Sequence, residues 1–191
     1  MKIYKSARIK AVFLLTLMVA IFMGCSKKKE RVYELLPPDP EMDKDLTELA
    51  IKMSVNIENR DGADAGEGSK KLIDGNIDTK FLIFSYAPDF YVELEYDIAQ
   101  RLDAYTITSA NDAPDRDPKN WTIVGSNDRT QWTELDSQVD QAFPERKQTR
   151  RFEFENGDTY KYYRINILAL GGANSALCQI AEWRVIRRPQ N

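Results

Sequence analysis

The sequence predicts an all-β fold, a two-sheet β-sandwich or jelly roll of about eight strands. Three observations predict it. Short segments that alternate apolar and polar residues begin near Leu46, clusters of turn residues separate them, and helical spacing is confined to residues 45–52. A chain of 191 residues suits one domain with a buried core.

The first 24 residues predict an export signal. Four cations, Lys2, Lys5, Arg8 and Lys10, precede the apolar run 11–24. A run of 14 residues is too short to span a bilayer, which takes roughly 20. The run ends in Gly24–Cys25, which resembles the lipobox of bacterial lipoproteins. We therefore expect cleavage before Cys25, lipidation of Cys25, and export to a bacterial membrane, the outer membrane by preference, held there by lipid alone. The alternative is a signal cleaved elsewhere, with Cys25 incidental.

Residues 25–45 predict a tether. Lysines at 27–29 are followed by Pro37, Pro38 and Pro40, a composition that extends a chain without burying side chains. The tether would hold the domain, residues 46–191, away from the membrane. Removing residues 1–24 takes away four cations and no anion, so the net charge falls from -3 to -7.

The predicted strands follow one another with long polar loops between them. The alternating segments are 53–57, 92–96, 105–107, 121–123, 152–154, 163–167 and a last strand over 179–186. The loops are 58–69, 85–90, 111–120, 136–149 and 170–177, and they are rich in Gly, Asp, Asn and Pro. Trp121, Trp132, Trp183 and Phe81 are expected in the core.

The composition excludes several functions. The sequence contains no histidine, which removes Ser-His-Asp and Cys-His nucleophile pairs and histidine-containing zinc or iron sites. Its two cysteines make no zinc cluster by themselves, and lipidation of Cys25 leaves Cys178 without a disulfide partner. A formal charge of -3 gives no reason to expect nucleic-acid binding.

Five pieces of the sequence occur in the order and spacing of the coagulation factor 5/8 type C, or discoidin, domains. They are Leu72–Phe81, Tyr91–Asp97, Trp121–Trp132, Tyr162–Ile165 and Gln179–Trp183. The chain from about 51 to 187 therefore resembles this family, which is similar to the family-32 carbohydrate-binding modules. The resemblance implies a galactose-binding-like jelly roll that binds glycans through loops at one end.

The resemblance also implies a structural calcium site. Carried over residue by residue, it uses the side chains of Asp74, Thr79 and Glu182 and the main-chain oxygens of Lys71, Asn76, Thr79 and Ala181. The chemistry agrees, because calcium takes six to eight oxygen ligands and a tight Asp-Gly-Asn turn can aim carbonyl groups inward. The alternative interpretation is an ordinary turn at Asp74–Gly75 and a solvated glutamate.

A sugar site usually pairs an exposed aromatic ring with a few polar groups. The predicted loop end offers Tyr86 and Phe90 for stacking, and it offers Asp89, Arg116, Arg146 and Asn174 for polar contacts. The alternative for each is an ordinary loop residue, and Arg116 could instead pair with a neighbouring carboxylate as scaffold.

The sequence favours non-catalytic capture of a glycan or polysaccharide, in company with other cell-envelope proteins of a glycan-uptake system. A glycosidase needs two carboxylates about 5 to 9.5 Å apart, and nothing in the spacing of Asp89, Asp117, Glu153 and Glu155 singles out a pair, so we expect no enzyme. The third interpretation is a protein-binding or assembly module of the cell envelope. A broad flat apolar patch would favour this module, and an aromatic cluster at the loop end would favour glycan binding.

Overall fold

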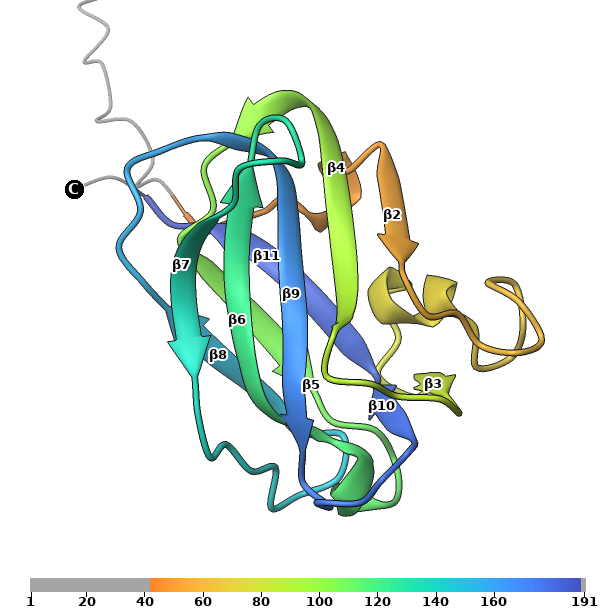
Figure 1. Ribbon diagram of the computed structural model, residues 1–191. Coiled ribbons are helices and arrows are strands. Elements are labelled where there is room, and N and C mark those ends of the chain that lie inside the picture. Colours follow the sequence, from red (N-terminus) through yellow and green to blue (C-terminus); the bar gives the residue numbers. More distant parts are fainter. Residues whose placement is uncertain (1–41, 190–191) are drawn as a thin grey trace, which may run out of the picture. The chain divides into compact units, whose positions relative to one another are not determined.

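The computed structural model describes residues 42–189 (Figure 1). The predicted signal, Cys25 and most of the tether lie outside these residues. The described chain contains eleven strands: β1 (Lys44–Asp45), β2 (Lys52–Val55), β3 (Phe81–Ile83), β4 (Phe90–Gln100), β5 (Ala104–Thr108), β6 (Pro118–Ser126), β7 (Thr133–Gln138), β8 (Thr149–Glu153), β9 (Tyr160–Leu170), β10 (Cys178–Ile180) and β11 (Glu182–Arg187). Three short 3-10 helices accompany them: η1 (Thr47–Leu49), η2 (Ser69–Ile73) and η3 (Pro114–Arg116). None of these described helices is long or apolar enough to cross a membrane.

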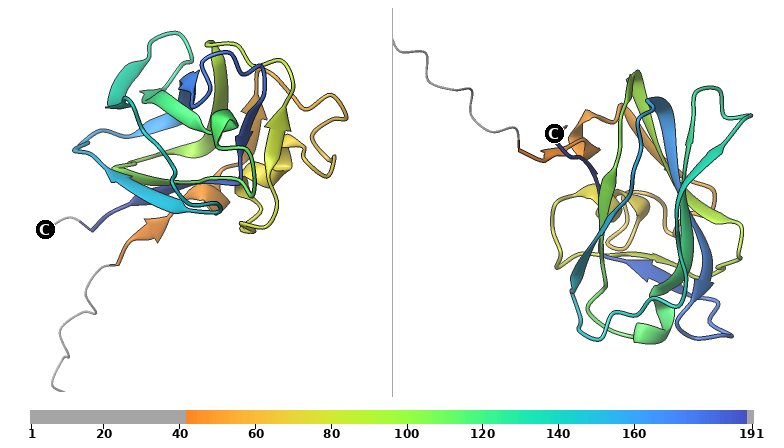
Figure 2. Two further views of the ribbon diagram at one scale, coloured as in Figure 1. Left: turned by 90° about the horizontal axis from the view of Figure 1, so that it is seen from below. Right: turned by 90° about the vertical axis from the view of Figure 1, so that its left-hand side faces the viewer.

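The strands form two facing antiparallel sheets, so the predicted β-sandwich is confirmed (Figures 1 and 2). One sheet has the order β2-β4-β9-β6-β7 and the other β1-β11-β5-β8, while β3 pairs with β10 separately. Along each long strand, alternate residues point between the sheets, as the period of two requires. The longest strands, β4 and β9, pair from Phe90 opposite Ile167 to Gln100 opposite Tyr160.

Aromatic side chains fill the core between the sheets. Trp121 of β6 and Trp183 of β11 are fully buried. The Tyr105 ring stacks on Phe152 at 5.2 Å between centroids, and Trp121 meets Phe152 edge-on at the same distance. Trp121 Nε1 donates a hydrogen bond to the Tyr105 hydroxyl at 2.7 Å, which satisfies the polar atom that a buried tryptophan brings with it.

The structure differs from the predictions at several places, and one of them is strand β3, which was not predicted. The expected last strand, 179–186, divides at Ala181, because β10 pairs with β3 whereas β11 pairs with β5. Strand β7 was not predicted, and the domain already includes β1, two residues inside the expected tether. Trp132 is only half-buried, with the Arg164 guanidinium over its ring at 4.1 Å, so its assignment to the core was wrong.

The connections between strands gather at two ends of the sandwich. The β3–β4, β5–β6, β7–β8 and β9–β10 connections meet at one end, the lower end in Figure 1, which we call the loop end. The β4–β5 and β8–β9 connections lie at the opposite end. Most of the predicted ligand residues therefore belong to one end of the fold.

Candidate functional site

Main-chain hydrogen bonds tie the connections of the loop end to one another. Tyr86 N–H donates to Ala176 O at 2.8 Å, and Gly172 N–H donates to Asp115 O at 2.7 Å. A Cβ on Gly171 would lie 2.6 Å from the carbonyl oxygen of Pro114, so the close approach of two connections requires glycine there. These contacts make the loop end a fixed surface.

A hollow of about 310 Å³ opens among these connections, and we call it the loop-end pocket. Its walls are formed by Pro114, Asp117, Pro118, Gln141, Ala142, Phe143, Pro144 and Gly171. Most of these walls are apolar, while Gln141 and Asp117 add hydrogen-bonding groups. Apolar walls with a few convergent polar groups are the usual composition of a small-ligand site.

Asp117 is the charged residue of the loop-end pocket. Its side chain is 4% exposed, and its Oδ2 accepts a hydrogen bond from Arg146 Nη2 at 2.6 Å. Its Oδ1 is buried without a hydrogen-bond partner in the described chain. Burial raises the pKa of this carboxyl above its usual range, although the Arg146 guanidinium acts in the opposite direction. A buried hydrogen-bond acceptor without a donor costs free energy. This cost favours a ligand that can donate a hydrogen bond to Asp117.

Arg146 stabilises the wall of the loop-end pocket through hydrogen bonds. Besides Asp117, its guanidinium donates to Phe143 O at 2.6 Å and to Asp112 O at 2.8 Å. The prediction placed Arg146 at the ligand. In the structure, three of its donors bond to the chain itself and position Asp117 and Phe143, and a contact of Arg146 with a ligand stays a prediction.

The two rings predicted for stacking have different environments. Phe90 is fully buried in the core as the first residue of β4, so its prediction as an exposed stacking surface was wrong. The sequence pattern did not reveal the burial of Phe90, because the residue that ends the predicted loop is also the first residue of a strand. Tyr86 is half-buried, and its hydroxyl donates to Ile167 O at 3.1 Å. Burial raises the pKa of Tyr86 to about 12.

Asp89, Arg116 and Asn174 lie on connections of the loop end, where the sequence placed them, but outside the walls of the pocket. Asp89 and Asn174 are exposed and Arg116 is half-exposed. Their contact with a ligand stays a prediction. Sequence reasoning did not select Phe143 and Pro144, although both stand in a predicted loop, because no spacing pattern marks a pocket assembled from three connections.

The residues predicted for calcium form a second group, none of which lines the loop-end pocket. Thr79 Oγ1 donates to Asp74 Oδ2 at 2.9 Å, and the Asn76 N–H donates to Asp74 Oδ1 and to Glu182 Oε1, both at 3.0 Å. Lys71 Nζ lies 3.3 Å from Asp74 Oδ2, and Ala181 is fully buried beside Glu182. The fold thus joins the turn after η2 to the start of β11.

The donor set of this group suits a hard cation such as calcium. Two carboxylates, a hydroxyl and main-chain carbonyls are all oxygen donors. Glu182 is 3% exposed, and its Oε2 is buried without a hydrogen-bond partner in the described residues. Burial, followed by the neighbouring Asp74 carboxylate, raises the pKa of Glu182 to about 7. Residues 42–189 contain no cluster of three or more His, Cys, Asp or Glu that could hold a metal, so main-chain oxygens would have to complete the shell.

Comparison with known proteins adds a family match. Residues 52–183 match the family described as "F5/8 type C domain". A peptide-N(4)-(N-acetyl-beta-glucosaminyl)asparagine amidase of Arabidopsis thaliana is 40% identical over 82 residues, which is 42% of this chain. The matched region spans only 11% of the amidase.

Solved structures match the fold. The family 32 carbohydrate-binding module of Clostridium perfringens NanJ, in complex with galactose, superposes with a TM-score of 0.60 at 16% identity, covering 76% of this chain and all of the module. The C-terminal domain of a Bacteroides fragilis chitobiase gives 0.59 at 18% identity, covering 77% of this chain and all of that domain. An F5/8 type C domain from another Bacteroides fragilis protein gives 0.60 at 19% identity, covering 80% of this chain and all of that domain. These likenesses show the jelly-roll architecture.

Proposed function

The chain belongs to the F5/8 type C domain family, and on that premise we propose that it binds a glycan, without catalysis, through the loop-end pocket. The observation that carries the proposal is the pocket itself, in which apolar walls surround the buried, half-satisfied carboxylate of Asp117. The galactose complex of the NanJ module supports the same class of ligand.

The pocket has the two kinds of contact that a pyranose uses. The C–H face of the sugar packs on the exposed side chains of Ala142 and Pro144, beside the buried Phe143 ring, and a ring hydroxyl donates a hydrogen bond to the Asp117 carboxylate. The Gln141 amide can donate to, or accept from, a second hydroxyl. Because the hollow is small, affinity should be modest, on the order of 10 µM to 1 mM, or about 4 to 7 kcal/mol. Many copies on one surface would supply avidity.

The proposal includes no reaction, even though one relative is an amidase. That relative shares only the matched region, so its activity does not transfer with the similarity. The absence of histidine from the sequence and the single carboxylate in the walls of the pocket support a binding role.

Two further properties belong to the proposal. Calcium, held by Asp74, Asn76, Thr79 and Glu182 with main-chain oxygens of Lys71 and Ala181, would stabilise the fold. A lipid on Cys25 would anchor the exported protein to a bacterial membrane, where polysaccharides are met. Lipid chains contribute about 0.8 kcal/mol per buried methylene, so several chains anchor without a spanning helix.

A glycan array followed by titration calorimetry tests the proposal. Asp117→Asn keeps the size of the side chain but alters the unpartnered acceptor, and it should weaken binding of an array hit at least tenfold. Glu134→Gln, which changes an exposed carboxylate on β7 outside the pocket walls, is the matched control and should bind like the wild type. Equal affinities of wild type and Asp117→Asn would place the site elsewhere. Absence of any glycan binding, together with co-purification of envelope proteins, would replace the proposal with the assembly module.

A further inference from the structure

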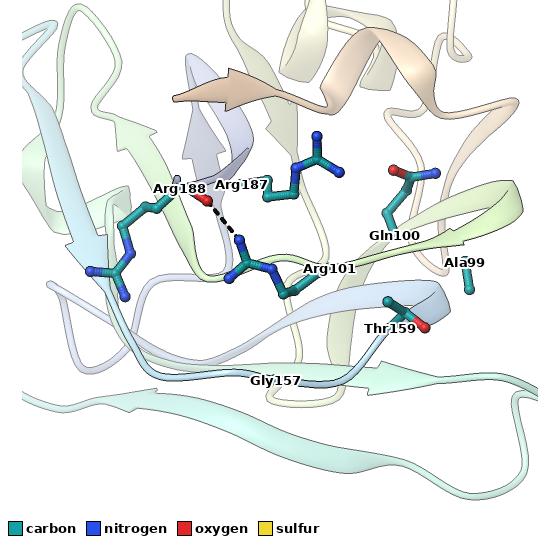
Figure 3. A pocket seen from close by; sticks show the side chains of 7 residues that line it. All are labelled: Ala99, Gln100, Arg101, Gly157, Thr159, Arg187 and Arg188. Carbon is teal, nitrogen blue, oxygen red and sulfur yellow. Dashed lines mark hydrogen bonds between the residues drawn. The ribbon is translucent and has the colours of Figure 1, made fainter. Parts of the chain in front are cut away.

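A second hollow lies at the end of the sandwich opposite the loop end, and arginines dominate its lining. It measures about 430 Å³. It is bounded by the end of β4 and the residue after it (Gln100, Arg101), by the connection before β9 (Gly157, Thr159), and by the end of β11 and the residue after it (Arg187, Arg188). Figure 3 shows their side chains arranged around it. We call it the basic hollow. Its lining carries three guanidinium groups and no carboxylate.

Two of the arginines are held rigidly by the fold. Arg101 forms an ion pair with the buried carboxylate of Asp103, and its Nη2 donates to the carbonyl oxygen of Arg188 at 2.6 Å (Figure 3). Asp103 Oδ1 in turn accepts from the N–H of Arg188 at 2.7 Å. Arg188 reaches the acidic side chains of Glu153 at 3.0 Å and Glu155 at 3.1 Å. The shape of the hollow is therefore fixed before any ligand arrives.

The third arginine is the one available to a ligand. Arg187 is exposed, and its guanidinium makes no ion pair or hydrogen bond with any residue of 42–189. Arg188 Nε is a buried donor without a hydrogen-bond partner in the described chain, and it lies 3.9 Å from Asp103 Oδ2. A free guanidinium offers five donors in a planar fork, a geometry that matches a carboxylate with two parallel hydrogen bonds. The surrounding neutral groups, the Gln100 amide and the Thr159 hydroxyl, suit the hydroxyls of a sugar.

The size and polarity of the hollow indicate what kind of molecule would carry the anionic group. A volume of about 430 Å³ exceeds what a bare inorganic anion fills, so the anionic group belongs to a larger polar body. Ala99 supplies the only purely apolar side chain of the lining, which leaves no surface for an acyl chain.

We propose that the basic hollow binds a uronate unit of an acidic polysaccharide, with the sugar carboxylate on Arg187 and its hydroxyls on Gln100 and Thr159. This site is separate from the loop-end pocket and does not depend on it. A polysaccharide chain could then be held at either end of one domain.

Titration of the full protein with trigalacturonate tests the proposal. Arg187→Ala should weaken binding at least tenfold, and Arg187→Lys should recover only part of it, because an ammonium cannot make the paired contact. Lys52→Ala, which removes an equally exposed cation on β2, should bind like the wild type. Asp117→Asn should also leave this binding unchanged, so failure of the loop-end site and failure of this one are distinguishable.

Control ligands distinguish a uronate from other sources of an anionic group, namely inorganic phosphate and lipid headgroups. The methyl ester of trigalacturonate keeps the body and loses the charge, so it should bind at least tenfold more weakly. Equal affinity for the ester, or an unaffected Arg187→Ala variant with an unchanged melting temperature, would overturn the proposal. Arg187-dependent binding of inorganic phosphate as tight as that of trigalacturonate would also overturn it, as would Arg187-dependent binding to phosphatidylglycerol vesicles without binding to trigalacturonate.

Discussion

The backbone N–H of Asn76 donates a hydrogen bond to Glu182 Oε1 at 3.0 Å, across 106 positions of the chain. The contact joins a turn near the start of the domain to its last strand. A cation bound there would link the same two segments, and a ligand bound only to the native state stabilises it by mass action.

We predict that calcium raises the melting temperature of the wild type. At a calcium concentration 100-fold above the dissociation constant, the gain is about 2.7 kcal/mol, which corresponds to roughly 5 to 10 °C for a domain of this size. Asp74→Ala and Glu182→Ala should abolish the shift, whereas Glu134→Ala, an exposed carboxylate on β7, should keep it. Thermal unfolding with calcium and with chelator measures it. A wild-type curve that is identical in both conditions contradicts calcium binding.

The pH dependence of stability should report on Asp117. Burial raises the folded-state pKa of its carboxyl, so ionisation costs the folded protein more than the unfolded chain. Its contribution to stability is therefore full below the unfolded pKa of about 4 and is lost as pH rises through the raised pKa. The stability of the wild type relative to Asp117→Asn should fall as pH rises above about 4. Denaturant titrations of both proteins measure the difference, and an opposite slope would show that Arg146 dominates.

Much of the fold could be predicted because its core strands alternate cleanly. A spacing of two between apolar residues predicts these strands, as with Tyr105 and Ile107 or Ile165 and Ile167. Strand β7 could not be predicted in the same way. It lies at the edge of its sheet, pairs only with β6 and buries little, so its sequence carries no apolar alternation. Edge strands of this kind are commonly polar.

The sites were predictable to different degrees. Most of the residues predicted for calcium stand in one short segment, Lys71–Thr79, whereas Ala181 and Glu182 come from far along the chain. The loop-end pocket has no such motif, because three connections build it and Phe143 reads as an ordinary loop residue. The basic hollow depends on the Arg187 guanidinium, which has no ion pair or hydrogen bond within residues 42–189, and a sequence does not reveal which arginine is left in this way.

A glycine on β6 should be intolerant of a methyl group. A Cβ on Gly125 would lie 2.5 Å from Cδ2 of the Tyr160 ring, which belongs to the core. Overpacking of this kind costs about 1 to 3 kcal/mol. Gly125→Ala should therefore lower the free energy of unfolding by that amount. Gly66→Ala, whose added methyl meets nothing within 4 Å, should stay close to the wild type. Equal stabilities of the two variants would show that the Tyr160 ring moves freely.

Lipidation should depend on Cys25 alone. Cells labelled with a fatty-acid analogue should mark the wild type and leave Cys25→Ala unmarked, while Cys178→Ala, which alters the second cysteine, should be labelled normally. Cys178 is buried in the core, which keeps its thiol away from acylating enzymes. Equal labelling of the wild type and Cys25→Ala would exclude the anchor at this position.

Loss of the hydroxyl group should affect the free energy of unfolding differently at two buried tyrosines. The Tyr105 hydroxyl accepts from Trp121 Nε1 at 2.7 Å and donates to Asp136 Oδ2 at 2.6 Å. Tyr105→Phe leaves the buried indole N–H without an acceptor, so the free energy of unfolding should fall by about 1 to 3 kcal/mol.

The Tyr96 hydroxyl is also buried, but it has no hydrogen-bond partner in the described residues. Tyr96→Phe should therefore be neutral or stabilising, because it removes an unsatisfied polar atom and keeps the ring. Urea titrations with equal m-values would isolate the two free energies. A loss of stability in Tyr96→Phe as large as that in Tyr105→Phe would mean that Tyr96 is satisfied in solution, for instance by an internal water, and that the contrast between the two sites is absent.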